Sequence, residues 1–368
     1  MEKAKVYFDD FRAPVGTSVL KKLDRLIRKA GMEEMDFQRK LVAIKMHFGE
    51  PGNLTFLRPN YAKVVADMVK ELGGVPFLTD CNTLYAGRRK NALEHLDAAY
   101  ENGFSPLSTG CQIVIGDGLR GTDDVEVPVR GGAYIQSAKI GRAVMDADVF
   151  ISLTHFKGHE ATGFGGAIKN IGMGCGSRRG KMEQHAAGKP RVSRRRCVGC
   201  RVCSHHCGQN AISYGEDKRA AIDYEKCVGV CNFDAIFSPD DSANGELNRK
   251  MAEYAKAVVD GRPAFHISLV QDISPYCDCH GESDIPILPD VGMFASFDPV
   301  ALDQACVDAC LKLDPIPGSL LDQRMHEEGF VDQHDHFCNT TPDTEWKSCL
   351  EHAEKIGLGS RDYELIRL

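Results

Sequence analysis

The stretch Val149–Gly176 reads VFISLTHFKGHEATGFGGAIKNIGMGCG and combines two features that decide the fold. Its first six residues, Val149–Thr154, form a mostly apolar run that predicts a buried strand. The remainder holds seven glycines and several ionisable side chains. Ligands of α/β proteins bind outside the carboxyl ends of parallel strands. The stretch therefore predicts one strand of such a sheet and a ligand-binding loop directly after it.

Strands and helices are expected to alternate on both sides of this stretch. Short apolar segments predict strands, and amphipathic segments that end at a glycine predict helices. The expected strands are 41–48, 75–79, 111–115, 149–154, 264–270 and 291–297, and the expected helices are 19–29, 60–72, 92–102, 246–260 and 300–313. Apolar strands that alternate with helices favour a mostly parallel sheet with helices on both faces. We therefore predict an α/β fold.

A run of four cysteines has the spacing C-x2-C-x2-C-x3-C, which is the iron–sulfur ligand spacing of bacterial ferredoxins. Its members are Cys197, Cys200, Cys203 and Cys207. A shortened second copy contains Cys227 and Cys231 and lacks the two middle cysteines. In two-cluster ferredoxins the fourth cysteine of each run binds the other cluster. The predicted ligands of one [4Fe–4S] cluster are therefore Cys197, Cys200, Cys203 and Cys231.

Two cysteines of these runs remain without a complete ligand set. Cys207 and Cys227 supply only two of the four thiolates that a second cluster needs. One alternative is a single cluster, with these two cysteines paired or free. The other is a second cluster, if the given sequence lacks a short stretch of the natural protein.

Length and cysteine placement predict how the chain is divided. With 368 residues, two or three domains are expected. We expect an α/β domain in two parts, residues 1–189 and 241–368, with a small ferredoxin-like (α+β) iron–sulfur insert at 190–240. Beyond Pro315 the chain is polar, and we expect an irregular C-terminal tail.

Composition excludes several classes of protein. The net charge of −7 does not favour nucleic-acid binding. No apolar run approaches the roughly 18 residues of a membrane span, and the start MEKAKVYFDD has no apolar signal-peptide core. The 15 cysteines then indicate metal ligands and reduced thiols. A cytoplasmic location is expected.

The loop Thr154–Gly176 contains the candidate catalytic residues. These are His155, Lys157, His159 and Lys169. Lysines and glycine-exposed backbone N–H groups suit an anionic small molecule, and a histidine can supply protons. The alternative interpretation is a mobile surface loop.

A second cluster of soft ligands is Cys277-Asp278-Cys279-His280. Two thiols and one imidazole can bind zinc or a further iron centre, so Cys277, Cys279 and His280 are candidate metal ligands. A redox-active thiol pair and a pair of plain reduced thiols are the alternatives.

The segment Arg178–Arg196 contains eight basic residues and a single acid, Glu183. One interpretation is a docking surface for a redox partner protein, which would donate or accept electrons. The other is a solvated linker.

Three stretches resemble an uncharacterised prokaryotic family. They are THFKGHEATGFGGAIKNIGMGC at 154–175, the ferredoxin-like cysteines, and DISPYCDCHG with PDVGMFASFDPVALDQA at 272–305. The family is known as domain of unknown function 362, and its members are often labelled iron–sulfur centre proteins. The resemblance covers about Val6–Cys310. It implies an α/β domain with a ferredoxin-like insert, and it implies no particular reaction.

This chain departs from the family at Cys227–Cys231, where members usually carry a complete second run. The α/β part also resembles the nickel-pincer lactate racemase family in general layout. The predicted function is an iron–sulfur oxidoreductase that passes electrons from a [4Fe–4S] cluster to an anionic substrate. The alternatives are a non-catalytic electron carrier or cofactor-assembly partner, and an isomerase with a structural cluster.

Overall fold

The computed structural model describes residues 3–84, 87–185, 192, 194, 197–201, 203–204, 210–223 and 243–368. Three predicted cluster cysteines, Cys207, Cys227 and Cys231, lie outside the described residues. More than half of the expected insert, residues 190–240, lies outside them as well.

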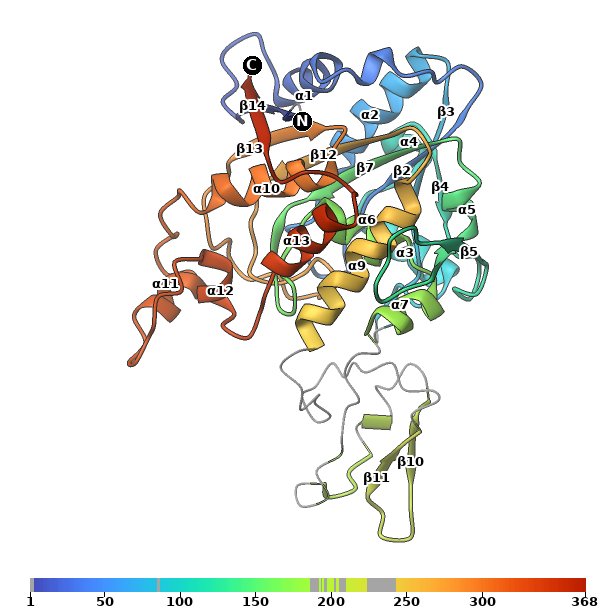
Figure 1. Ribbon diagram of the computed structural model, residues 1–368, viewed down its shortest axis with the longest axis vertical. Coiled ribbons are helices and arrows are strands. Elements are labelled where there is room, and N and C mark those ends of the chain that lie inside the picture. Colours follow the sequence, from blue (N-terminus) through green and yellow to red (C-terminus); the bar gives the residue numbers. More distant parts are fainter. Residues whose placement is uncertain are drawn as a thin grey trace.

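An eight-stranded sheet forms the centre of the molecule (Figure 1). Its strands are β1 (Ala4–Asp9), β2 (Leu41–Lys45), β3 (Val75–Asp80), β4 (Gln112–Ile115), β7 (Val149–His155), β12 (Ala264–Val270), β13 (Gly292–Ser296) and β14 (Tyr363–Arg367). The order across the sheet is β14-β1-β13-β12-β7-β2-β3-β4. Strand β13 is antiparallel to both of its neighbours, and all the other adjacent pairs are parallel. The predicted α/β class with a mostly parallel sheet is confirmed.

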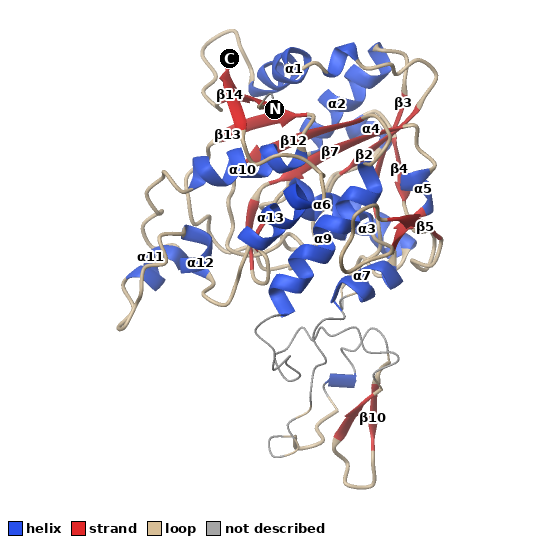
Figure 2. Cartoon of the chain, viewed as in Figure 1, coloured by secondary structure: helices blue, strands red, loops and turns tan. Residues whose placement is uncertain are grey.

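Helices cover both faces of this sheet (Figure 2). They are α1 (Val19–Lys29), α2 (Pro59–Glu71), α3 (Ala92–Glu101), α4 (Pro106–Thr109), α5 (Arg142–Met145), α6 (Ala167–Cys175), α7 (Arg178–His185), α9 (Ala243–Val259), α10 (Pro299–Cys310), α11 (Leu320–Met325), α12 (His336–Thr340) and α13 (Lys347–Lys355), with a short 3-10 turn at Met32–Glu34.

The side chains of β7 alternate between the two faces of the sheet and show which helices cover each face. Phe150 packs into a core with α6, α9, α10 and α13, whereas Val149 and Ile151 pack into a second core with α1 and α2. Successive side chains of a strand point to opposite faces. A strand that is buried on both faces therefore reads as a continuous apolar run, which is how it was recognised in the sequence.

The chain after Pro315 differs from the predicted irregular tail. It forms α11, α12, α13 and β14, and β14 pairs in parallel with β1 at the edge of the main sheet. The prediction of an irregular tail was wrong. Edge strand β14 reads YELIR, with two charged exposed residues among partly buried ones. Such a short polar strand gives little signal in the sequence.

Three small two-stranded sheets lie outside the main one. They are β5 (Asp124–Pro128) with β6 (Ser137–Gly141), β8 (Lys157–His159) with β9 (Gly163–Gly165), and β10 (Ile212–Tyr214) with β11 (Ala220–Ile222). The β10–β11 pair is antiparallel and follows the described cluster cysteines in the chain. Within the part of the chain that the structure describes, no helix is both long and apolar enough to cross a membrane.

Strand order identifies where a ligand site is expected. The chain runs outward from β2 to β3 and β4 on one side, and from β7 to β12 on the other. The order therefore reverses between β2 and β7. Open α/β sheets bind ligands at such a switch point, beyond the carboxyl ends of the strands.

The core of β7 gives a stability test. We expect Phe150→Ala to lower the free energy of unfolding by about 3–5 kcal/mol, because the fully buried ring leaves a cavity at the centre of the sheet. Leu107→Ala is the control, since Leu107 is 97% exposed and should change the unfolding free energy little. Urea unfolding followed by circular dichroism measures both, and equal effects would contradict this description of the core.

Candidate functional site

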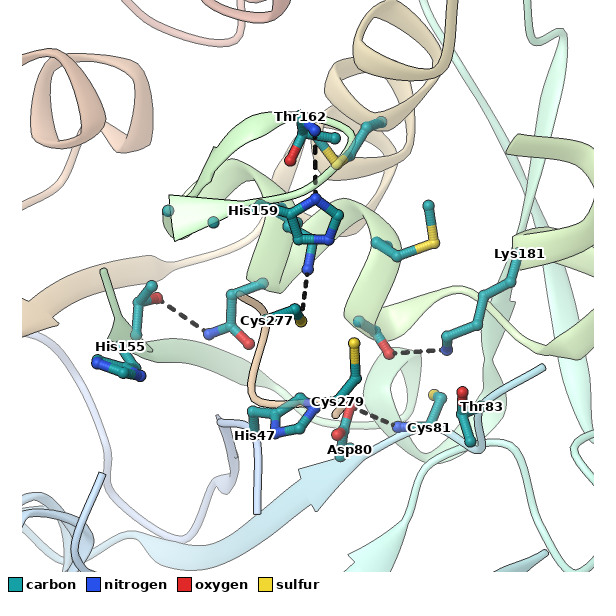
Figure 3. Close-up of a pocket in the computed structure, with 18 of the residues that line it drawn as sticks. His47, Asp80, Cys81, Thr83, His155, His159, Thr162, Lys181, Cys277 and Cys279 are labelled. Atoms are coloured by element: carbon teal, nitrogen blue, oxygen red, sulfur yellow. Dashed lines mark hydrogen bonds between the residues drawn. The ribbon is translucent and has the colours of Figure 1, made fainter. Parts of the chain in front are cut away.

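A pocket lies at the expected place, beyond the carboxyl ends of the parallel strands (Figure 3). It contains about 870 Å³ of empty space, including open solvent at its mouth. Lys45 ends β2, Asp80 ends β3 and His155 ends β7, and all three line the pocket. The sheet thus brings together segments that lie far apart in the sequence.

The pocket lining is rich in cations and sulfur. Its ionisable and thiol side chains are Lys45, His47, Asp80, Cys81, Arg89, His155, Lys157, His159, Lys169, Lys181, His185, Cys277 and Cys279. All four candidate catalytic residues of the sequence are among them, together with two of the three candidate metal ligands. The stretch 154–176 is therefore a pocket wall and not a mobile surface loop. Catalysis by these residues stays a prediction.

Helix α6 begins at Ala167 because a distant carboxylate caps it. The Asp303 carboxylate accepts hydrogen bonds from the N–H groups of Ala167 (2.6 Å) and Ile168 (2.9 Å). A Cβ at residue 166 would collide with the Asp303 carboxylate, so a larger residue there would have to displace this cap. The sequence suggested that N–H groups of this loop face an anionic ligand, but at the start of α6 they are already bonded to Asp303.

His155 is held by partners at both ring nitrogens. Nδ1 lies 2.9 Å from Asp278 Oδ2, and Nε2 lies 2.8 Å from the Gln271 carbonyl oxygen. Lys157 Nζ contacts the same Asp278 oxygen at 3.0 Å. Burial alone would raise the pKa of Asp278, but His155 and Lys157 hold it well below its usual range. His155 therefore positions Asp278 and offers no free nitrogen to a ligand.

His159 has a defined tautomer. Its Nδ1 accepts hydrogen bonds from the N–H groups of Ala161 (3.0 Å) and Thr162 (3.2 Å), so the proton resides on Nε2. His159 also hydrogen-bonds to the Cys277 thiolate. Of the two predicted histidines, His159 is therefore the one whose N–H group is directed at Cys277.

Cys277 and Cys279 form an asymmetric pair. A hydrogen bond from the Cys279 thiol, together with the nearby Lys169 ammonium, holds the pKa of Cys277 well below its ordinary value, although burial opposes this. The same hydrogen bond raises the pKa of Cys279. Lys169 Nζ lies 3.1 Å from Cys277 Sγ. The pocket thus contains one thiolate with a matched cation, and one neutral thiol.

Several site residues were missed in the sequence. Lys45 Nζ contacts Asp80 Oδ1 at 3.0 Å and Asn170 Oδ1 at 2.8 Å. Arg89 Nε contacts Glu50 Oε2 at 2.8 Å. Asp80 directly follows the predicted strand 75–79, and that position was a signal which could have identified it. Lys45 lies inside the predicted strand 41–48, whereas the observed strand ends at this residue. Arg89 lies in a loop and gave no signal.

The structure groups the candidate metal ligands differently from the sequence. One ligand atom each from Glu160, Cys279 and His280 lie within 4.8 Å of one another, and this group does not include Cys277. Burial would raise the pKa of Glu160, but His159 and His280 lower it to about 2, so its carboxylate is charged. Glu160 was not among the candidates.

Three of the predicted cluster ligands are described, and none of the three forms a disulfide. Cys197 Sγ accepts a hydrogen bond from Ala220 N–H (3.4 Å), and hydrogen bonds from Ala220 and Gly199 lower the pKa of this thiol. Cys203 Sγ lies 3.3 Å from the Tyr214 hydroxyl, and Cys200 is exposed. Free thiols with N–H donors to sulfur suit an iron–sulfur cluster, whose potential such bonds tune.

The basic segment 178–196 is not one continuous surface in its described part. Arg179 pairs with Asp124 at 2.7 Å, whereas Lys181 lines the pocket. Arg194 lies 3.9 Å from Asp217, and its neighbours Arg195 and Arg196 lie outside the described residues. A docking role for this end of the segment stays a prediction.

The buried Asp278 pair gives a pH-dependent test. Asp278→Asn should lower the free energy of unfolding by about 3–5 kcal/mol at pH 7, because the buried Lys157 loses its counter-charge. The pKa of Asp278 is lowered in the folded protein, so its contribution is complete above the unfolded value of about 3.9 and is lost as the pH falls below it. Urea unfolding should show that the difference in unfolding free energy between the native protein and Asp278→Asn is constant from pH 8 to 5 and shrinks below pH 4.

The control for this test is Asp36→Asn, which removes an exposed carboxylate and should leave the unfolding midpoint unchanged. If the difference in unfolding free energy between Asp278→Asn and the native protein grew as the pH fell, the lowered pKa assigned to Asp278 would be contradicted.

The chain is similar to several known proteins in sequence or in structure. A thylakoid-associated protein of Synechocystis is 30% identical over 131 residues, which are 34% of this chain and 35% of that protein. The match thus spans about a third of that relative's length. The lactate racemase apoprotein of Thermoanaerobacterium thermosaccharolyticum gives a TM-score of 0.44 at 14% identity, over 99% of this chain and 82% of the other.

A crystal structure of a Thermotoga maritima protein gives a TM-score of 0.40 at 13% identity, over 79% of this chain and 57% of that one. A family model described as "Domain of unknown function (DUF362)" matches residues 42–308, which is well over half of the chain. The resemblance drawn from the sequence is thereby confirmed, and the chain belongs to the DUF362 family.

Proposed function

We propose that the protein is a cytoplasmic iron–sulfur oxidoreductase that reduces an anionic small molecule in the sheet-edge pocket. The observation that carries this proposal is the charge of the pocket. Five lysine and arginine side chains line it, and Asp80 is the single carboxylate among the described lining residues. Such a concentration of positive charge in a concave site attracts anions.

The balance of these charges indicates where an anion binds. Three of the five cations form ion pairs with carboxylates. Lys45 is paired with Asp80, Lys157 with Asp278 and Arg89 with Glu50. Lys169 is matched by the Cys277 thiolate.

Lys181 differs from the other four cations. Its hydrogen bonds within the described residues go to the main-chain oxygens of Gly174 (3.3 Å) and Gly176 (2.5 Å). Lys181 has no direct ion pair among the described residues, although its charge acts on the buried Asp117 and Asp80. A bound anion would give Lys181 a direct ion pair.

The cysteines suit the electron source that this activity needs. Cys197, Cys200 and Cys203 would hold a [4Fe–4S] cluster together with Cys231, which lies outside the described residues. When bound, such a cluster supplies single electrons from a redox partner protein. We assign Cys207 and Cys227 as a remaining pair or as free thiols, within a ferredoxin-like insert at 190–240.

The pocket residues divide the remaining work. Lys181 and the Lys169 ammonium bind and orient the anion, and His159 Nε2–H donates a hydrogen bond next to Cys277. Asn170 links the ends of β2 and β7, since its amide nitrogen donates to Thr154 Oγ1 (3.0 Å) and to the Lys45 carbonyl oxygen (3.3 Å). Preorganised donors of this kind need not rearrange during the reaction.

Anion binding can be tested with inorganic phosphate and citrate as probes. Both should raise the melting temperature of the native protein, and Lys181→Met should weaken their apparent affinity about tenfold, because a charged hydrogen bond contributes about 1.5–3 kcal/mol. Thermal-shift titration at constant ionic strength measures the effect.

Lys256→Met is the matched control for this titration. Lys256 is as buried as Lys181 and also contacts a main-chain oxygen, that of Gly357, but it lies outside this pocket. Equal loss of affinity in the two variants, or no anion binding by the native protein, would contradict the proposal and favour the non-catalytic electron carrier.

Iron content tests the cofactor. Anaerobically purified protein should contain about four irons and four acid-labile sulfides per chain, with a single uncoupled EPR signal after reduction. Cys200→Ser should lose most of both, because it removes one of the four predicted thiolates. Cys111→Ser, which changes a buried thiol in the core of the α/β domain, should retain them.

Two results would count against the assignment. About eight irons with a spin-coupled spectrum would contradict a single cluster, and an iron-free protein would contradict the proposed function.

A further inference from the structure

Three side chains with different ligand atoms meet beside the pocket. Glu160 lies in the turn between β8 and β9, and Cys279 and His280 lie in the segment after β12. Strands β7 and β12 are parallel neighbours, so the segments that follow them emerge side by side. The ligand atoms of the three residues lie within 4.8 Å of one another.

We propose that Glu160, Cys279 and His280 bind a zinc ion with an open fourth position toward the pocket. Thiolate, imidazole and carboxylate are ligands that zinc takes in proteins, and the Cys279 thiol would release its proton to solvent as the ion binds. Calcium and magnesium prefer oxygen ligands alone, so the thiol of Cys279 argues against them. Three protein ligands with one open position are typical of catalytic zinc sites.

The present geometry is close to what zinc needs. Bond lengths of about 2.0–2.3 Å place tetrahedral ligand atoms roughly 3.3–3.7 Å apart. His280 Nε2 and Glu160 Oε1 are now 2.9 Å apart in a hydrogen bond, and the widest separation in the group is within 4.8 Å. Small rotations of side chains that are 37% and 41% exposed would close the site around an ion.

Cys277 is excluded from this ligand set by its own partner. Its Sγ lies 3.1 Å from the Lys169 ammonium, which already balances its charge, and Cys277 is not among the three residues whose ligand atoms lie within 4.8 Å of one another. The sequence suggested Cys277, Cys279 and His280 as ligands. The fold replaces Cys277 with Glu160.

The open position faces the pocket because of how the ligands are arranged. Cys279 lines the pocket (Figure 3), whereas Glu160 and His280 are not among its lining residues and are partly exposed. An ion between them lies in the pocket wall. There it would accept an oxygen of an anionic ligand and polarise it as a Lewis acid. Zinc binding itself does not depend on the proposed redox activity.

Zinc binding can be measured on the full-length protein. The protein is equilibrated with zinc chloride, passed through gel filtration and analysed for zinc per chain by mass spectrometry. Glu160→Gln, Cys279→Ser and His280→Asn should each bind one zinc fewer than the native protein. With cobalt in place of zinc, the native protein should show thiolate-to-cobalt absorption that Cys279→Ser lacks.

Two matched controls separate this site from its neighbours. Glu282→Gln changes an exposed carboxylate of the same segment, and Cys277→Ser changes the other thiol; both should bind zinc as the native protein does. Equal zinc in the native protein and Glu160→Gln would overturn the proposal, as would loss of the ion in Cys277→Ser. Iron and sulfide contents should stay equal in all variants, which distinguishes this result from failure of the cluster assignment.

Discussion

The buried ion pair between Lys45 and Asp80 fixes the floor of the pocket. The two side chains end adjacent parallel strands, are 1% and 4% exposed, and lie 3.0 Å apart. Charges this deep are tolerated only when each has several partners. Asn170 Oδ1 accepts from Lys45, and Asp80 Oδ1 accepts from Cys81 N–H. The pair therefore joins β2, β3 and α6 into one rigid base.

The need of each buried charge for partners also explains the pocket wall. Asp278 is fully buried because His155 and Lys157 surround it, and Cys277 is a buried thiolate because Lys169 and His159 face it. Each anion in the wall has its own cation. Lys181 donates hydrogen bonds to main-chain oxygens, and its charge acts on the buried Asp117 and Asp80.

Both parts of the chain, before and after the cysteine region, contribute to this arrangement. Strand β7 precedes the cysteine region and β12 follows it, yet they are parallel neighbours. The chain therefore leaves the sheet, carries the ferredoxin-type cysteines and returns to the same sheet. Antiparallel strand β13 and edge strands β1 and β14 then complete it. Through this return Cys277, Cys279 and His280 lie beside the loop that follows β7.

The sequence by itself determined the α/β class, most strands of the sheet and the loop 154–176 as a pocket wall. Apolar runs and helical spacing are local, so a linear reading can detect them. The tertiary structure alone decided that Lys45, Asp80 and Lys181 share the pocket, that Asp303 caps α6, and that Glu160 joins Cys279 and His280. These contacts join residues up to 136 positions apart. Strand order and register create such contacts, and no local sequence pattern predicts either of them.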